Sequence, residues 1–194
     1  MEVEVNRKHF NLILAGVLAG LYLVLTLPFA QIASGMIQFR LAETIAVLPA
    51  LTPAAIPGVF FGCLLANFLN PQNLGPIDIF GGSLTTLLAA CLTYVLAKPL
   101  RCYLKMEKSE QAEAIGLRKS ANISKFVSLI PPVILNGLIV GTYLPFLFST
   151  ETPVIGVILT TILSITVSQT IVIFGLGLPL LISLSKNKAI LKYI

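Results

Sequence analysis

Long apolar runs, separated by short polar or proline-rich breaks, constrain the fold of this chain more than any other feature. Hydrophobic residues make up 56% of its 194 residues and charged residues only 11%, which is not the composition of a soluble globular surface. An apolar helix of about 20 residues crosses a bilayer. The sequence therefore predicts an all-α integral membrane protein with a single domain over residues 1–194.

Six apolar segments are expected to be transmembrane helices. Prolines and glycines interrupt the apolar pattern between them, since proline lacks a backbone donor and glycine favours turns. The expected spans cover residues 12–27, 41–51, 54–69, 79–97, 126–148 and 154–184. The second and third are short, so a single re-entrant hairpin over residues 41–69 is the alternative.

The basic residues predict how the spans are oriented. Twelve of the thirteen Lys and Arg fall within residues 7–8, 98–125 and 186–192. Six spans place these three segments on one side of the membrane, and the positive-inside rule makes that side cytoplasmic. Fusing residues 41–69 into one span would put the hydrophilic segment 98–125 outside. We therefore expect six spans, with the N- and C-termini cytoplasmic.

Three charged residues lie at the edges of apolar runs on the expected outer side. Arg40 and Glu43 are three residues apart and can share a helix face, while Asp78 precedes a span expected to begin at Ile79. A charge at membrane depth costs roughly 2.5–3.5 kcal/mol, so it needs a partner or a function. A salt bridge accounts for Arg40 and Glu43, and helix capping accounts for Asp78. The functional alternative is that these groups bind a ligand carrying an amine or amidine.

Uncharged polar side chains within or beside the spans are further candidates for substrate binding. Interhelical hydrogen bonding is the ordinary reason for such residues in a membrane. Amides also pair with the edge of a heterocycle, and a tyrosine can stack or donate a hydrogen bond. The candidates are Gln38, Asn67, Asn136, Tyr143 and Gln169.

The sequence offers little for catalysis. His9 is the only histidine, so neither a histidine-based metal site nor a catalytic triad can form, and no metal is expected. The chain also lacks the Gly-x-x-x-x-Gly-Lys-Ser/Thr loop that binds ATP. Cys63, Cys91 and Cys102 lack metal-ligand spacing and are interpreted as apolar filler without a disulfide. We expect a non-enzyme without its own cofactor, and ATP-driven transport would require another chain.

The first expected span carries small residues at helical spacing, namely Ala15, Gly16, Ala19 and Gly20. Small residues let helix backbones approach closely where lipid removes the hydrophobic driving force. They indicate either packing within this chain or contact with a partner subunit.

Several motifs resemble a known family. They are Gln38-Phe39-Arg40-Leu41-Ala42-Glu43, Val47-Leu48-Pro49, Leu51-Thr52-Pro53-Ala54-Ala55-Ile56-Pro57-Gly58, Gly62-Cys63-Leu64-Leu65-Ala66-Asn67, and the segment from Gly81 to Ala90. Together they are similar to the QueT family, the substrate-binding S components of energy-coupling-factor (ECF) importers for queuosine precursors. The specific part of the likeness covers residues 38–90.

The resemblance implies a six-helix bundle in a bacterial plasma membrane, with a transmembrane T component and two cytoplasmic ATPases as partners. The Ala-x-x-x-Ala contact of the family is matched by Ala15 and Ala19, which favours the partner interpretation of the first span. A ligand such as 7-aminomethyl-7-deazaguanine carries an amine and a guanine-like edge. Glu43 and Asp78 suit these two ends, in an order that the sequence leaves open.

Other functions remain as alternatives. An S component for another vitamin or nucleobase would share this architecture. A self-sufficient secondary transporter is less favoured because no inverted repeat is found. A small membrane enzyme lacks support because nucleophile and base pairs are scarce.

Overall fold

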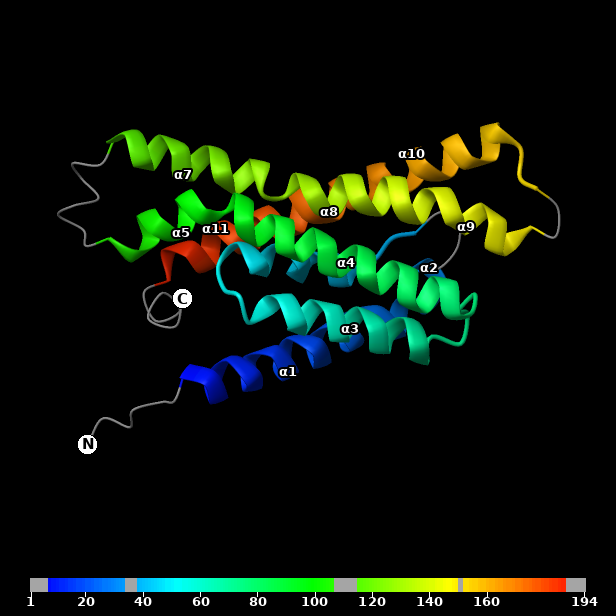
Figure 1. Ribbon diagram of the computed structural model, residues 1–194, viewed down its shortest axis with the longest axis horizontal. Coiled ribbons are helices and arrows are strands. Elements are labelled where there is room, and N and C mark those ends of the chain that lie inside the picture. The colour runs from blue at the N-terminus through cyan, green and yellow to red at the C-terminus, as the bar shows by residue number, and fades with distance from the viewer. Residues whose placement is uncertain (1–6, 34–37, 107–114, 150–151, 188–194) are drawn as a thin grey trace.

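The computed structural model describes residues 7–33, 38–106, 115–149 and 152–187, and these form a bundle of helices without a strand (Figure 1). In chain order the elements are α1 (Arg7–Thr26), η1 (Leu27–Phe29), α2 (Ala30–Ala33), η2 (Leu41–Ala50), α3 (Ala55–Leu69), α4 (Pro76–Leu96), α5 (Lys98–Lys105), α7 (Ile115–Val127), α8 (Ile130–Leu135), η3 (Asn136–Val140), α9 (Gly141–Phe148), α10 (Ile155–Val172), η4 (Ile173–Gly177) and α11 (Leu178–Lys186). The elements η1 and η2 are 3₁₀ helices, and η3 and η4 are π-helical.

Four helical stretches of the described chain are long and apolar enough to cross a membrane. They cover Lys8–Phe29, Pro76–Leu96, Gly116–Phe148 and Ile155–Lys186. Large apolar side chains point away from the bundle on these helices, such as Leu12, Leu84 and Ile155, each more than half exposed. A soluble protein rarely exposes so much apolar surface, whereas lipid solvates it. The chain is therefore a multi-pass membrane protein.

The two remaining apolar helices, η2 and α3, are shorter and correspond to the second and third expected spans. η2 lies in the middle of the bundle and packs against α1, α3, α4, α10, α11 and η4. Its buried residues cover nearly its whole circumference, as expected for a helix that is apolar all round. A 3₁₀ helix has three residues per turn and rises about 2.0 Å per residue, so η2 is slim and covers about 20 Å. It is the central helix of the bundle.

Glycines allow the later helices to approach each other and η2. A Cβ atom at Gly141 would lie 2.7 Å from the Cα atom of Ile162, and one at Gly177 would lie 2.5 Å from Cγ1 of Val47. The π-helical segment η4 contains Gly175 and Gly177, and Pro179 lies in the first turn of α11 that follows it.

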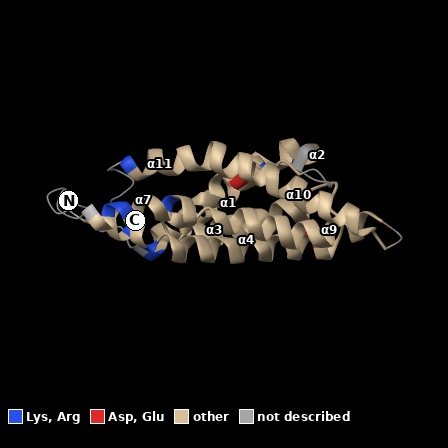
Figure 2. Cartoon of the chain, turned by 90° about the horizontal axis from the view of Figure 1, so that it is seen from above, with Lys and Arg blue, Asp and Glu red and all other residues tan. Residues whose placement is uncertain are grey.

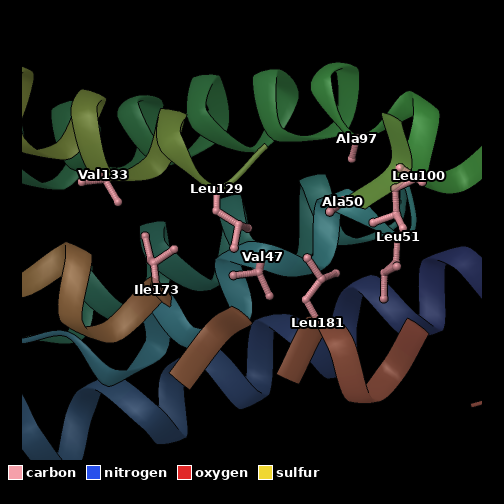
Figure 3. Close-up of a cluster of buried hydrophobic side chains, with 10 residues drawn as sticks. Val47, Ala50, Leu51, Ala97, Leu100, Leu129, Val133, Ile173 and Leu181 are labelled. Carbon is pink, nitrogen blue, oxygen red and sulfur yellow. The ribbon is translucent and has the colours of Figure 1, made fainter. Parts of the chain in front are cut away.

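Three apolar clusters fill the interior of the described bundle. One consists of Tyr22, Ala42, Ile45, Val59, Cys63, Ala66 and Ala90, and the other two, a larger and a smaller one, lie at different depths. The larger cluster joins η2, α8, η4 and α11 to α5 and α7 through Val47, Ala50, Leu51, Ala97, Leu100, Ala121, Leu129, Val133, Ile173 and Leu181 (Figure 3). The smaller cluster consists of Val140, Leu144 and Ile165. Asn136 and Gln169 lie between the two clusters along their helices, so a polar layer separates the apolar layers.

The basic residues gather at one end of the bundle, called here the basic end, where α1 begins and α11 ends (Figure 2). The segment 98–125, expected only to be hydrophilic, is helical over α5 and most of α7, and residues 107–114 lie outside the described residues. α5 and α7 pack against each other there. Arg101 of α5 stacks on Tyr94 and donates to the carbonyl of Ala50, which ties the end of η2 to the basic end.

Candidate functional site

Glu43 is buried in the centre of the bundle. Its side chain is 1% exposed, and Oε1 accepts a hydrogen bond of 2.8 Å from the hydroxyl of Tyr22 in α1. No described residue lies within hydrogen-bond reach of Oε2. Burying a carboxylate oxygen without a hydrogen bond costs free energy. Oε2 is therefore a strong acceptor that remains available to a donor. Sequence reasoning missed Tyr22, although a phenol in an otherwise apolar run is a signal for it.

Arg40 supplies positive charge to this site. It is 7% exposed, directly precedes η2, and interacts electrostatically with both Glu43 and Asp78. The backbone N–H of Glu43 donates to the carbonyl of Arg40 at 3.1 Å, which closes the first turn of the 3₁₀ helix. One buried arginine thus balances two buried carboxylates.

Asp78 lies in the first turn of α4 rather than before it, because the helix begins at Pro76. The expected N-cap role is therefore wrong. Its Oδ2 accepts from the backbone N–H of Leu74 at 3.4 Å, and its Oδ1 accepts from the hydroxyl of Tyr143 at 3.4 Å. Both contacts are long, so the carboxylate keeps capacity for a further donor. Tyr143 of α9 thus donates to Asp78, whereas the sequence suggested it as a group that stacks on or donates to a ligand.

Asn67 belongs to a buried hydrogen-bonding group between α3 and α4. Its Nδ2 donates to the sulfur of Cys63 at 3.6 Å, and Thr86 donates to the same sulfur at 3.4 Å. Cys63 is therefore an acceptor in a polar group, not merely the apolar filler that the sequence indicated. The side chains of Asn67 and Tyr143 also converge on Gly82, where a Cβ would lie 3.0 Å and 3.5 Å from their polar atoms.

Asn136 and Gln169 are 5% and 3% exposed, on η3 and α10, which pack against each other. Among the described residues, neither Nδ2 of Asn136 nor Oε1 of Gln169 has a hydrogen-bond partner. The other buried side-chain atoms without a described partner are Oε2 of Glu43 and Oγ1 of Thr93. Three of these four atoms belong to residues that the sequence singled out for binding.

The remaining candidate, Gln38, is 3% exposed and lies two residues before Arg40. No described group of three or more His, Cys, Asp or Glu residues could hold a metal ion. The structure therefore places all eight candidates in the interior, with Tyr143 half-buried, and links Glu43 to Tyr22 and Asp78 to Tyr143 directly.

The small residues of α1 divide between two faces. Ala15 is 9% exposed, and a Cβ at Gly58 of α3 would lie 3.0 Å from its carbonyl oxygen. A Cβ at Gly62 would likewise lie 3.1 Å from the Cα atom of Ala19. Gly16 and Gly20 are exposed, with open space where a Cβ would stand.

Beside them a groove of about 570 Å³ runs along α1 and the start of α3. It is lined by Lys8, Asn11, Leu12, Ala15, Gly16, Ala19, Pro53, Ala54, Pro57 and Phe61. Ala15 and Ala19 thus pack against α3 and also border an open, mainly apolar groove.

Comparison with known proteins places the chain in a family. The profile of the QueT transporter family matches residues 12–186. The queuosine precursor transporter QueT of Lactococcus lactis subsp. cremoris (strain MG1363) is 30% identical over 91 residues, which cover 46% of this chain and 52% of that relative. The matched part is therefore about half of the relative, and no solved structure matches the chain significantly. Because the family profile covers nearly the whole helical bundle, this multi-pass membrane protein belongs to the QueT transporter family.

Proposed function

We propose that the chain is the substrate-binding S component of an ECF-type importer and captures a queuosine precursor such as 7-aminomethyl-7-deazaguanine. The observation that carries the proposal is the buried carboxylate of Glu43, whose Oε2 has no described partner, inside a bundle that is otherwise mostly apolar. A carboxylate held this way binds a donor-rich ligand well, because hydrogen bonds to charged acceptors strengthen where water is excluded. The ligand class is taken from the name of the Lactococcus relative.

The proposal includes six membrane crossings with both termini cytoplasmic. The positions of the basic residues support it, since they gather at one end of the bundle. Glu43 and Asp78 then lie toward the outer half, where a ligand arrives from outside. η2 and α3 count as the second and third crossings, shortened because η2 is enclosed by other helices.

Partner subunits complete the proposed importer. Because the chain has no ATP-binding loop, a T component and two cytoplasmic ATPases would supply the energy. The groove along α1 supports a docking place for the T component, since Gly16 and Gly20 leave its surface smooth and open.

Calorimetric titration of the purified chain tests the ligand class. 7-Aminomethyl-7-deazaguanine should bind, whereas riboflavin, thiamine and other vitamins should not. Glu43→Gln and Asp78→Asn should each weaken binding about tenfold or more, since each removes a charged acceptor. Equal affinity in the wild type and both variants would refute the assigned site, and tight binding of a vitamin alone would refute the ligand class.

Uptake into vesicles tests the mode of transport. Vesicles that hold this chain alone should not accumulate the ligand, whereas vesicles with the complete complex and ATP should do so. Accumulation by the chain alone would show a self-sufficient transporter instead.

A further inference from the structure

We infer that Glu43, Asn136 and Gln169 read the hydrogen-bonding edge of the deazaguanine ring, while Asp78 and Tyr143 meet its aminomethyl group. This inference rests on the proposed function and assigns the two carboxylates to different ends of the ligand. Glu43, Asn136 and Gln169 are called the reading layer below.

The residues of the reading layer all lie near one apolar cluster of the bundle. Each of its residues is about one helical turn from a member of the larger apolar cluster, on the side away from the basic end. The pairs are Glu43 with Val47, Asn136 with Val133, and Gln169 with Ile173. These three cluster members pack in the same apolar group, with Val133 and Ile173 together at one side of the view in Figure 3. Three polar side chains from three elements therefore border the same apolar cluster, each on its side away from the basic end.

The elements that carry the site enclose a common interior. η2 packs against both α4 and α10, and η3 also packs against both α4 and α10. Glu43, Asn136, Gln169 and Asp78 each come from a different member of this closed ring, and each is at least nine-tenths buried. These four side chains are therefore buried within the bundle rather than exposed to lipid.

The side-chain atoms of the reading layer that have no described hydrogen-bond partner are complementary to a guanine-like edge. Tyr22 already donates to Oε1 of Glu43, so this carboxylate offers Oε2 as its open acceptor. Oε1 of Gln169 is a second acceptor, and Nδ2 of Asn136 is a donor. A deazaguanine presents two N–H donors, at N1 and N2, and one carbonyl acceptor, O6. Two acceptors and one donor are the complement of that edge, whereas an adenine-like edge places an amino donor where O6 stands.

Neighbouring elements of the site also come in the same order as the polar groups around the ligand. The aminomethyl group at position 7 neighbours O6, which is followed by N1–H and then N2. Asp78 on α4 adjoins η3 with Asn136, and η3 adjoins α10 with Gln169. Tyr143, which donates to Asp78, lies two helical turns beyond Asn136 on the same continuous stretch. Asp78 therefore binds the amine, and Asn136 donates to O6. Gln169 and Glu43 accept from the two N–H groups.

A cycle of three ligands and four variants tests this assignment. The ligands are 7-aminomethyl-7-deazaguanine, its 7-cyano counterpart without the ammonium, and the 2-desamino form of the first. Their dissociation constants are measured calorimetrically for the wild type and for Glu43→Gln, Asp78→Asn, Asn136→Leu and Gln169→Met. Asn122→Leu serves as the matched control, because Asn122 is an exposed amide on α7, and thermal melting verifies that each variant is folded.

Asp78→Asn should erase the preference for the aminomethyl over the cyano ligand. The variants of the reading layer should weaken binding of the aminomethyl and the cyano ligand by a similar factor of about tenfold. They should keep the preference for the aminomethyl ligand. Removing the 2-amino group from the ligand should cost less affinity in Gln169→Met or in Glu43→Gln than in the wild type. The reason is that one of these two positions accepts a hydrogen bond from that amino group in the wild type. The control should behave as the wild type.

Loss of the aminomethyl preference in Glu43→Gln instead of Asp78→Asn would overturn the assignment. Unchanged affinities in both Asn136→Leu and Gln169→Met would also overturn it, while leaving the proposed function intact. If the wild type bound no deazaguanine, the assignment and the proposed function would fail together.

Discussion

At the scale of single residues, the pairing of Tyr22 with Glu43 explains how a carboxylate is kept in an apolar bundle. The 2.8 Å hydrogen bond from Tyr22 and the nearby charge of Arg40 offset part of the cost of burying this carboxylate. The same hydrogen bond fixes the orientation of the carboxylate. Tyr22 is therefore a positioning residue for Glu43.

Removing the Tyr22 hydroxyl should weaken ligand binding more than it weakens the fold. In Tyr22→Phe the ring still fills its space beside Gly62, but Oε1 of Glu43 loses its donor. We expect the dissociation constant to rise about tenfold, measured by calorimetry. Tyr103→Phe on α5, at the basic end, is the comparison and should leave the dissociation constant unchanged. An unchanged constant in Tyr22→Phe would show that Tyr22 does not position the carboxylate.

At the scale of elements, the central 3₁₀ helix depends on close contacts with its neighbours. Extended 3₁₀ segments are uncommon because their hydrogen bonds are less well aligned, so packing must hold η2 in this form. η4 supplies part of that packing through Gly177, which leaves space for Val47 and for the carbonyl of Thr44. Thr44 directly follows Glu43, so this contact also sets the position of the site.

A methyl group at Gly177 should therefore affect both stability and binding. Gly177→Ala places a Cβ 2.5 Å from Val47 and should destabilise the protein by about 1–3 kcal/mol through overpacking. A lower melting temperature and weaker ligand binding are expected together. Gly175→Ala in the same π-helical segment is the matched control, because nothing lies within 4 Å of its Cβ position. Equal melting temperatures for the two variants would contradict this account of η2.

At the scale of the whole molecule, the polar candidate residues lie inside the bundle and large apolar side chains are exposed on its outer surface. The groove along α1 and the start of α3 interrupts the lipid-facing surface with small residues, beside the packing contacts between these two helices. Ala15 and Ala19 contact α3 closely, so a large substitution at either would disturb the fold as well as any partner. Gly16 is the cleaner position for testing the groove.

Gly16→Trp should abolish assembly with the T component and the ATPases while leaving ligand binding unchanged. Space is open at Gly16, so the indole would project from α1 into the groove without touching η2. Co-purification with the partner subunits and calorimetry on the isolated chain measure the two effects. Gly156→Trp on α10 provides the control, since it adds the same side chain at another open glycine. Normal co-purification of Gly16→Trp would remove the groove as the proposed docking place.

The amino-acid sequence by itself determined the membrane class, the bounds of the two short apolar helices and the identity of the polar candidates. Apolar length and proline breaks are local properties, so the expected segments 41–51 and 54–69 agree closely with η2 and α3. The burial of Glu43, Asn136 and Gln169 was also predictable, because polar residues in apolar helices avoid lipid.

Only the tertiary structure decided which polar groups meet. The hydrogen bond from Tyr22 to Glu43 joins residues 21 apart in the sequence, and the contact between Tyr143 and Asp78 joins residues 65 apart. The sequence also could not show that residues 41–50 form a 3₁₀ helix enclosed by the other helices. Apolar periodicity over ten residues does not distinguish a lipid-facing helix from a central one. Helix packing places Glu43 in the core, because glycines on α3 and η4 let the surrounding helices close around it.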